Sequence, residues 1–182
     1  MVEIRFHGRG GQGIATAAEL FARSAAYEGK SVQSTPVFGA ERRGALVSSY
    51  ARVSQDMIWL REPVDKPNIV VVFDITVLKE INVLDGITSG GHIIINTPKN
   101  PSELKEQLKT KVKVHAVDAT RIAVDFTKRP MVNTVILGAL LQVTKLFTMD
   151  SIKRAVLYRF PKTDIDATMK AIDTAKKSVL VT

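Results

Sequence analysis

The chain has 182 residues, of which 45% are hydrophobic and 24% are charged, and both values are ordinary for one globular domain. It contains no cysteine, which excludes disulfides, thiolate zinc sites, a cysteine nucleophile and an iron–sulfur cluster ligated by this chain alone. The net charge of +8 is compatible with nucleic acid, but the basic residues are scattered and only 6% of residues are aromatic, so we expect no nucleic-acid partner.

The amino-terminal segment and the apolar runs argue against targeting and membrane insertion. Glu3, Arg5 and His7 interrupt the first apolar run, so no signal sequence is expected. The runs Ile69–Phe73 and Val135–Val143 are too short to span a bilayer. We therefore expect a soluble, cytoplasmic protein that has no membrane partner.

Strand-like and helix-like segments alternate along the chain. Strands are predicted at Val2–His7, Val32–Val37, Ala45–Val53, Met57–Leu60, Ile69–Phe73, His92–Asn96 and Lys113–Val117. Helices are predicted at Ile14–Glu28, from Asp74 to about Leu84, and at Ser102–Leu108, Ala119–Phe126, Val132–Leu146, Ser151–Phe160 and Asp164–Ser178. This alternation predicts a single α/β domain over residues 1–182, with a Rossmann-like three-layer α/β/α fold, a mostly parallel sheet and a C-terminal helical segment.

A glycine-rich turn, Gly8-Arg9-Gly10-Gly11-Gln12-Gly13, lies between the first predicted strand and the first predicted helix. Its glycines match the pattern G-x-G-x-x-G. Such a turn directs several backbone N–H groups and the positive end of a helix dipole at one point, which suits a phosphate. The alternative is that the glycines only allow close packing of the strand on the helix.

The surrounding sequence lacks the usual companions of this motif. A dinucleotide site expects a carboxylate at the end of the second strand, but no acid occurs in Val32–Val37 and Glu41 comes late. No Gly-Lys-Ser/Thr follows the glycines, so hydrolysis of a nucleoside triphosphate is not expected. Arg42 and Arg43 would serve a phosphate of NADP and the phosphates of coenzyme A equally well.

The segment from Ser34 to Gly44 gathers hydroxyls, glycines, Glu41 and the arginine pair between two strands. At the carboxyl edge of the sheet it would lie near the first turn, where open α/β sheets bind ligands. A solvated loop in which Glu41 pairs with an arginine is the equally weighted alternative.

Other polar residues are better explained as structural. His7, His92 and His115 are widely separated in strand-like runs and have no metal-ligand spacing. Asp74 ends an apolar strand and caps the next helix or faces a ligand, with capping favoured. Asn133 is expected to cap the long helix that follows it, and Asp150 or Ser151 the helix after that.

Together these segments resemble the gamma subunit of the 2-oxoacid:ferredoxin oxidoreductases, the pyruvate synthase group, over nearly the whole chain. The resemblance is carried by Gly8–Gly13 and by Val32–Gly44, with support from Asn133–Ala139 and Arg159–Lys162. Family members often have proline after an aromatic–glycine pair at the position of Ala40, so the loop does not assign a substrate subtype.

The resemblance implies one component of an enzyme that oxidatively decarboxylates a 2-oxoacid with coenzyme A to acyl-CoA and CO2 and passes electrons to ferredoxin. It implies thiamine diphosphate and magnesium on alpha and beta partners, and iron–sulfur clusters on beta and delta partners. Pyruvate and branched-chain 2-oxoacids are the leading substrates, and 2-oxoglutarate is possible. A stand-alone NAD(P)-dependent reductase is the rival interpretation.

On this interpretation the chain alone has no catalytic residue and no metal site. It borders the active site and helps to bind coenzyme A or partner subunits. The residues expected to contact a cofactor are Gly8, Gly10, Gly11, Gln12, Gly13, Glu41, Arg42 and Arg43.

Overall fold

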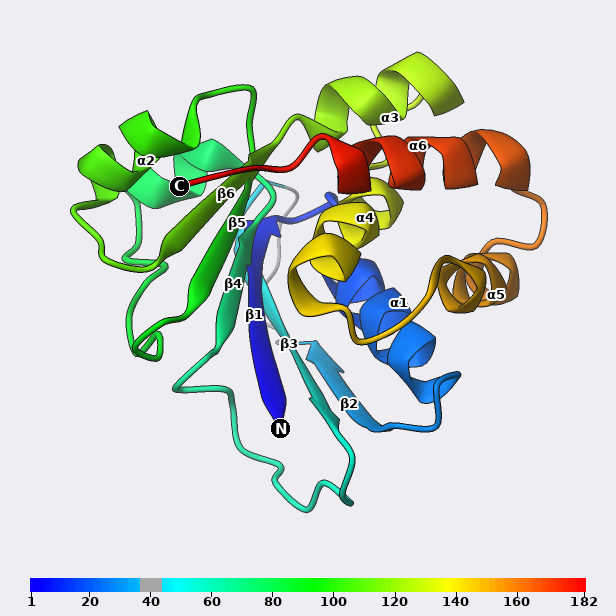
Figure 1. The fold of residues 1–182 in the computed structure, drawn as a ribbon, viewed down its shortest axis with the longest axis horizontal. Coiled ribbons are helices and arrows are strands. Elements are labelled where there is room, and N and C mark those ends of the chain that lie inside the picture. The colour runs from blue at the N-terminus through cyan, green and yellow to red at the C-terminus, as the bar shows by residue number, and fades with distance from the viewer. Residues whose placement is uncertain (37–43) are drawn as a thin grey trace.

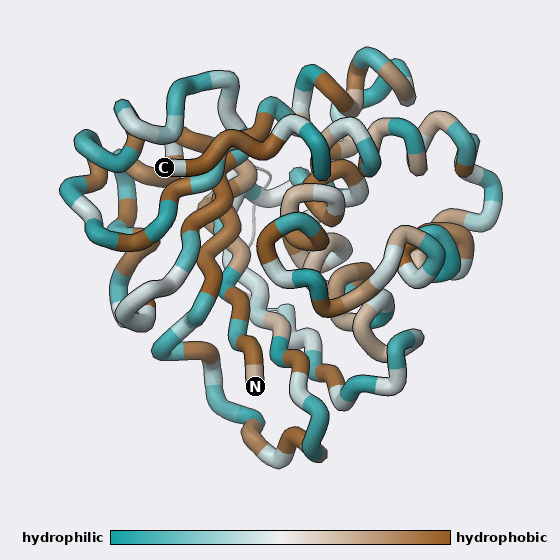
Figure 2. Tube along the Cα trace, in the orientation of Figure 1, coloured by the Kyte–Doolittle hydropathy of each residue, from teal (hydrophilic) through white to brown (hydrophobic). Residues whose placement is uncertain are grey.

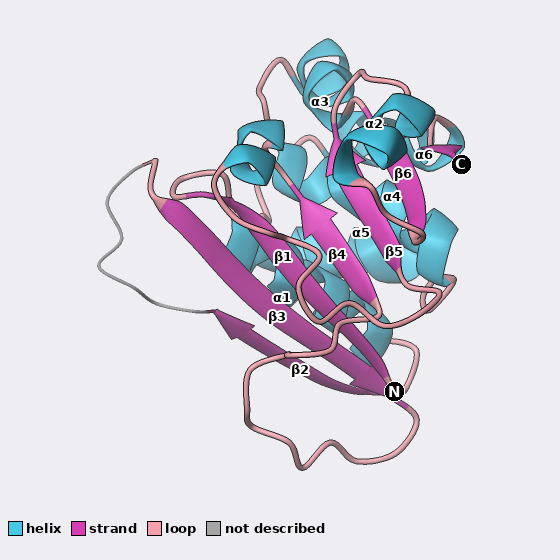
Figure 3. Cartoon of the chain, turned by 90° about the vertical axis from the view of Figure 1, so that its left-hand side faces the viewer, coloured by secondary structure: helices cyan, strands magenta, loops and turns pink. Residues whose placement is uncertain are grey.

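The computed structural model describes residues 1–36 and 44–182. A seven-stranded sheet has the order β2-β3-β1-β4-β5-β6-β7 (Figures 1 and 3). The strands are β1 (Val2–Arg9), β2 (Ser31–Pro36), β3 (Leu46–Ser54), β4 (Ile69–Val72), β5 (His92–Asn96), β6 (Lys113–Val117) and β7 (Leu180–Val181). Strands β1, β4, β5 and β6 are parallel, whereas β3 runs antiparallel to β1 and β2, and β7 antiparallel to β6.

Helices cover both faces of the sheet and make three layers (Figure 1). They are α1 (Ile14–Ala26), the 3-10 helix η1 (Ile75–Lys79), α2 (Pro101–Leu108), α3 (Ala119–Thr127), α4 (Val132–Thr144), α5 (Met149–Arg159) and α6 (Ile165–Lys177). Helices α1 and α3 to α6 pack on one face, and α2 with η1 packs on the other. The predicted three-layer α/β fold is thus confirmed.

Strand β4 shows why a run of apolar residues becomes a central strand. All four of its residues are buried, and their side chains alternate between the two faces. Val71 joins the core under α1 and α4, whereas Val70 and Val72 join the core under α2. Figure 2 shows the resulting concentration of hydrophobic residues along the central strands.

Two predicted helix caps are wrong. Thr148 caps α5, because its extended backbone directs its hydroxyl to the N–H of Ser151, and Asp150 lies one residue inside the helix. Asn133 lies within α4, which begins at Val132, and no side chain of the described chain caps that helix. Several cap-forming residues lie close together at each position, so the sequence pattern alone does not choose between them.

Three elements also differ from the predicted ones. Met57–Leu60 is not a strand but part of the long loop between β3 and β4. The helical segment after β4 ends at Lys79 rather than near Leu84. The short strand β7 at Leu180–Val181 was not predicted, because two residues are too few to show a period. Within residues 1–36 and 44–182, no helix is long and apolar enough to cross a bilayer.

The antiparallel orientation of β3 brings the ends of β1 and β2 and the start of β3 to the same edge of the sheet. Since β3 lies between β1 and β2 and opposes both, β1 and β2 point the same way. Arg9 at the end of β1, Pro36 at the end of β2 and Leu46 at the start of β3 therefore share the carboxyl edge of the sheet. The described residues on either side of 37–43 lie at the edge where the sequence placed this segment.

Candidate functional site

The glycine turn occupies the space between β1 and α1 and cannot accept side chains at two positions. Gly13 is the N-cap of α1 with a φ of 76°, a left-handed conformation that favours glycine. A Cβ at Gly13 would also lie 2.6 Å from the Asn133 Nδ2. A Cβ at Gly8 would collide with the Ile14 side chain. Backbone conformation and close packing therefore favour glycine at these two positions.

Some amides of the turn donate hydrogen bonds within the protein, whereas others, called open amides below, find no acceptor among the described residues. The Gly10 N–H donates to the Ala45 carbonyl at 2.8 Å, and the Gln12 N–H donates to Arg9 at 3.1 Å. The N–H groups of Gly11 and Gly13, and those of residues 14–16 in the first turn of α1, find no acceptor among the described residues. They lie at the positive end of the α1 dipole, so this corner offers donors to an anion.

These open amides border a cleft of about 300 Å³. Its walls come from the turn, the first residues of α1, the end of β2 and the start of β3. The lining residues are Arg9, Gly10, Gly11, Gly13, Ile14, Ala15, Pro36, Val47, Ser48 and Ser49. Gly11 and Ala15 are exposed.

A second cleft of about 280 Å³ lies on the other side of the turn. It is lined by Gly11, Gln12, Phe73, Asn96, Thr120, Pro130 and Val132. It occupies the carboxyl ends of β1, β4 and β5, where the chain crosses to opposite faces after β1 and after β4. Open α/β sheets place their ligands at such a switch point.

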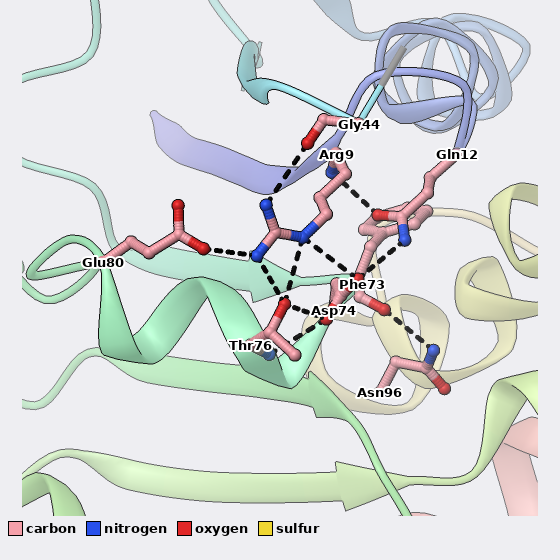
Figure 4. A network of polar contacts seen from close by, with 8 residues as sticks. All are labelled: Arg9, Gln12, Gly44, Phe73, Asp74, Thr76, Glu80 and Asn96. Atoms are coloured by element: carbon pink, nitrogen blue, oxygen red, sulfur yellow. Dashed lines mark hydrogen bonds and ion pairs between the residues drawn. The ribbon is translucent and has the colours of Figure 1, made fainter.

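Arg9 fixes the turn against η1 from within the glycine motif (Figure 4). Its guanidinium Nη2 donates to Thr76 Oγ1 at 2.7 Å and lies 2.5 Å from Glu80 Oε1. Its Nη1 donates to the carbonyl of Gly44 at 3.2 Å. Arg9 therefore connects three separate segments at the carboxyl edge.

Gln12 and Asp74 make a second connection across the same edge (Figure 4). The Gln12 Oε1 accepts from the Arg9 N–H at 2.8 Å, and its Nε2 donates to Asp74 Oδ2 at 3.0 Å. Burial alone would raise the pKa of Asp74, but hydrogen bonds from Thr76 and Gln12 and the charge of Arg9 lower this pKa below its usual value. Asp74 also caps η1 by accepting from the Thr76 N–H, so the capping prediction is confirmed and the ionised carboxylate orients Gln12 as well.

The turn also binds Gly44, the last residue of the segment from Ser34 to Gly44 that the sequence analysis singled out. Gly44 donates its N–H to the Gly10 carbonyl at 3.2 Å, next to the bond between Gly10 and Ala45. Glu41, Arg42 and Arg43 lie outside the described residues, and their contacts stay predictions. Pro36 and Gly44, which the structure does describe, both lie at the edge where the turn is found.

Several residues at this edge were missed by sequence reasoning. Arg9 was read only as a variable position of the motif, and Thr76, Glu80 and Asn96 were not singled out. Asn96 donates to the Phe73 carbonyl at 2.9 Å and so joins β5 to the end of β4 (Figure 4). The available signal was a polar residue directly after a buried strand, which holds for Asn96 but not for Glu80.

Comparisons with known proteins show the family of this chain. The family model described as pyruvate ferredoxin/flavodoxin oxidoreductase matches residues 3–178. The chain belongs to this family.

Two curated relatives match over nearly their whole length. The pyruvate synthase subunit PorC of Methanocaldococcus jannaschii is 41% identical over 180 residues, covering 99% of this chain and 98% of the relative. The common subunit gamma of the pyruvate/ketoisovalerate oxidoreductases of Thermococcus kodakarensis is 41% identical over 182 residues, covering 100% and 98%. The resemblance to a gamma subunit, and with it the interpretation as a component of an oxidoreductase, is confirmed.

Solved structures extend the likeness to the fold. The pyruvate oxidoreductase subunit PORC of Thermotoga maritima has a TM-score of 0.88 and 34% identity, covering 100% of this chain and 98% of that one. A 2-oxoglutarate:ferredoxin oxidoreductase of Magnetococcus marinus, solved with 2-oxoglutarate, coenzyme A and succinyl-CoA bound, has a TM-score of 0.75. At 21% identity, with 97% of this chain covering 30% of that one, the latter shows the fold alone.

The residues of this family member do not fit a metal or iron–sulfur group. The sequence has no cysteine, and the described residues contain no cluster of three histidine, cysteine or acidic side chains. The open amides of the turn suit a phosphate instead.

Two of the three histidines are neighbours in the sheet. His92 on β5 and His115 on β6 stack, with His92 Nδ1 and His115 Nε2 2.9 Å apart. Burial, followed by the charges of His92 and Lys113, lowers the pKa of His115 to about 4. Burial, followed by the charge of Arg5, lowers the pKa of His7 to about 4 as well. His92 and His115 are widely separated in the sequence, and the pairing of β5 with β6 brings them together in space.

This burial predicts acid sensitivity. An unfolded histidine titrates near pH 6.5, whereas folded His115 titrates at about 4, so the unfolded state binds more protons between these values. The free energy of unfolding is therefore expected to be highest above pH 6.5 and to fall as the pH approaches 4. His115→Gln should reduce the slope in this window by up to about 1.4 kcal/mol per pH unit, the value for one proton.

Urea unfolding of both chains at several pH values measures these slopes. Between pH 7.5 and 8.5 histidine is neutral in both states, and the slopes should agree there. Equal slopes between pH 6.5 and 4 would show that folding does not displace the titration of His115.

Proposed function

We propose that this chain is the gamma component of a 2-oxoacid:ferredoxin oxidoreductase. The complex converts a 2-oxoacid and coenzyme A to acyl-CoA and CO2 and passes electrons to ferredoxin. The curated relatives, which match over the full chain and are named as subunits of such enzymes, support this function. The observation that carries the role of this chain is the set of open amides at Gly11, Gly13 and the start of α1.

The chain binds and orients rather than reacts. Its turn receives a phosphate of coenzyme A in the cleft between α1 and β3, where the amides and the helix dipole favour negative charge. Arg42 and Arg43 add bidentate donors to a phosphate or to a carboxylate of a neighbouring subunit. Gly8, Gly10 and Gln12 shape the turn, and Glu41 pairs with one of the arginines.

The partners supply the remaining chemistry. Thiamine diphosphate with magnesium, held on alpha and beta subunits, supplies the decarboxylation chemistry when bound. Iron–sulfur clusters on beta and delta subunits accept the electrons, since this chain has no cysteine to ligate them. The gamma chain borders this centre and contributes one wall of the coenzyme A site.

Pyruvate is the leading substrate. The relatives from Methanocaldococcus jannaschii and Thermococcus kodakarensis carry pyruvate, or pyruvate and ketoisovalerate, in their names. Both relatives are 41% identical to this chain, and only the second carries ketoisovalerate in its name as well. A branched-chain 2-oxoacid is therefore the second choice of substrate.

The stand-alone NAD(P) reductase is disfavoured by the end of β2. Within the described residues, β2 ends on Ser34, Thr35 and Pro36, and none of these is the carboxylate that holds ribose hydroxyls in dinucleotide-binding folds. Titration of the chain with NADH and NADPH, followed by nicotinamide fluorescence, discriminates the two functions. Tight binding of either nucleotide would favour the reductase.

Reconstitution tests the subunit function. The purified chain is expected to show no 2-oxoacid-dependent dye reduction, because its sequence has no cysteine to ligate an iron–sulfur cluster. Addition of its alpha, beta and delta partners should restore reduction with pyruvate and coenzyme A. Full activity of the lone chain, or full activity of the partners without it, would contradict the proposal.

A charge-removing substitution tests the coenzyme A contact in the assembled enzyme. Arg43→Gln should raise the KM for coenzyme A roughly tenfold or more, because a charge-assisted hydrogen bond contributes about 1.5–3 kcal/mol. The KM for the 2-oxoacid should stay unchanged. Arg121→Gln on the exposed face of α3 is the matched control, since its side chain is 78% exposed. An unchanged KM for coenzyme A in Arg43→Gln would assign this arginine to another role.

A further inference from the structure

The loop between β3 and β4 carries an apolar projection at the opposite edge of the sheet from the glycine turn. It is the long loop that extends beyond the amino-terminal end of β1 (Figures 1 and 3). Met57 is 67% exposed, Trp59 is 80% exposed and Leu60 is 45% exposed. Trp59 is the single tryptophan of the chain. Large apolar side chains gathered in the open in this way mark an interaction surface rather than a solvated loop.

The base of this loop is held firmly. Val64 is buried, with 1% of its surface exposed, and fills the space beneath the loop. Arg52 Nη2 donates to the Pro63 carbonyl at 3.2 Å, and Arg5 Nη1 donates to the Val64 carbonyl at 3.5 Å. The Ile58 N–H donates to a serine hydroxyl of β2 at 3.3 Å. The apolar side chains are thus presented from a fixed base, which lowers the ordering cost of binding.

Arg52 is itself locked in place by the sheet. Only 4% of its surface is exposed, and its Nε donates to Glu3 Oε1 at 2.7 Å. Its Nη1 donates to Gln33 Oε1 at 2.9 Å, so the side chain bridges β1, β2 and the loop. This buried arginine donates hydrogen bonds to one carboxylate, one side-chain amide and one loop carbonyl. These bonds fix the position of the loop relative to the sheet.

The uncharged side chains of this loop indicate what kind of partner surface it fits. Met57 to Leu60 carry no charge and lie between Asp56 and Arg61, so the surface fits an apolar pocket with a polar rim. Curated relatives that match over the full chain are named as subunits of larger enzymes, so a companion subunit is the occupant that the proposed function supplies.

We propose that the segment Met57–Leu60 docks this chain to a companion subunit of the same oxidoreductase, with Trp59 inserted in an apolar pocket of that subunit. This inference rests on the proposed function, because curated relatives over the full chain are named as subunits. Tryptophan at the centre of an interface commonly contributes most of the binding energy, and its indole N–H takes an acceptor at the pocket rim. Docking at this edge leaves the glycine turn, at the other end of β1, open to its ligand.

The single tryptophan allows a direct test. The full chain is labelled with 5-fluorotryptophan and mixed with unlabelled alpha, beta and delta subunits prepared without it. The fluorine resonance of Trp59 should respond to the exchange of H2O for D2O in the free chain and lose this response in the complex. Trp59→Ser should weaken assembly roughly 30-fold, the size expected for a central interface residue, with an unchanged far-UV circular dichroism spectrum.

Tyr158→Ser on α5 is the matched control, since this aromatic residue is 64% exposed but lies away from the loop, and it should assemble normally. A complex that forms while Trp59 stays exposed to solvent, with Trp59→Ser assembling normally, would overturn the docking site and leave the proposed function standing. A lone chain that dimerises and shields Trp59 would overturn the choice of occupant. Absence of any complex would overturn the proposed function and the docking site together.

Discussion

The arrangement of the site depends on how the turn between β1 and α1 is held at the carboxyl edge. Arg9 and Gln12 belong to the glycine motif, and both reach across the edge to η1 and its cap Asp74. The backbone of Gly10 is meanwhile bonded to Gly44 and Ala45. These contacts occupy polar groups on one side of the turn, whereas the amides of Gly11 and Gly13 have no acceptor within residues 1–36 and 44–182. A preorganised set of donors binds an anion without first rearranging.

The position of β3 between β1 and β2 explains why a cleft lies on each side of the glycine turn. Because β3 lies between β1 and β2, the end of β2 is displaced from the turn, and the space between them becomes the cleft with Pro36 and Ser49 in its wall. On the other side, Phe73, directly after β4, and Asn96, at the end of β5, line the second cleft. A ligand that carries both phosphate and organic parts has room on either side of the donors.

Much of the fold could be predicted from local patterns, because β4 is apolar at every position and the helices repeat their apolar residues at helical spacing. The antiparallel insertion of β3 could not, since side-chain alternation does not encode the direction of pairing. The glycine turn was found because its conformational demands restrict residue type, as at Gly13. The contacts of Arg9 and the pairing of His92 with His115 were missed, because they join residues far apart in the sequence and depend on strand order.

Hydrogen exchange at the turn, measured on the assembled oxidoreductase, tests the anion site most directly. Several amides from Gly11 to Thr16 have no acceptor in the part of the chain that the structure describes, and they should exchange rapidly in the free enzyme. Coenzyme A should slow their exchange, whereas pantetheine, which lacks the phosphates, should not. The peptide that covers α2, on the other face of the sheet, should be unaffected by either compound. Saturation with coenzyme A that leaves the exchange of Gly11 to Thr16 unchanged would contradict a phosphate site at this turn.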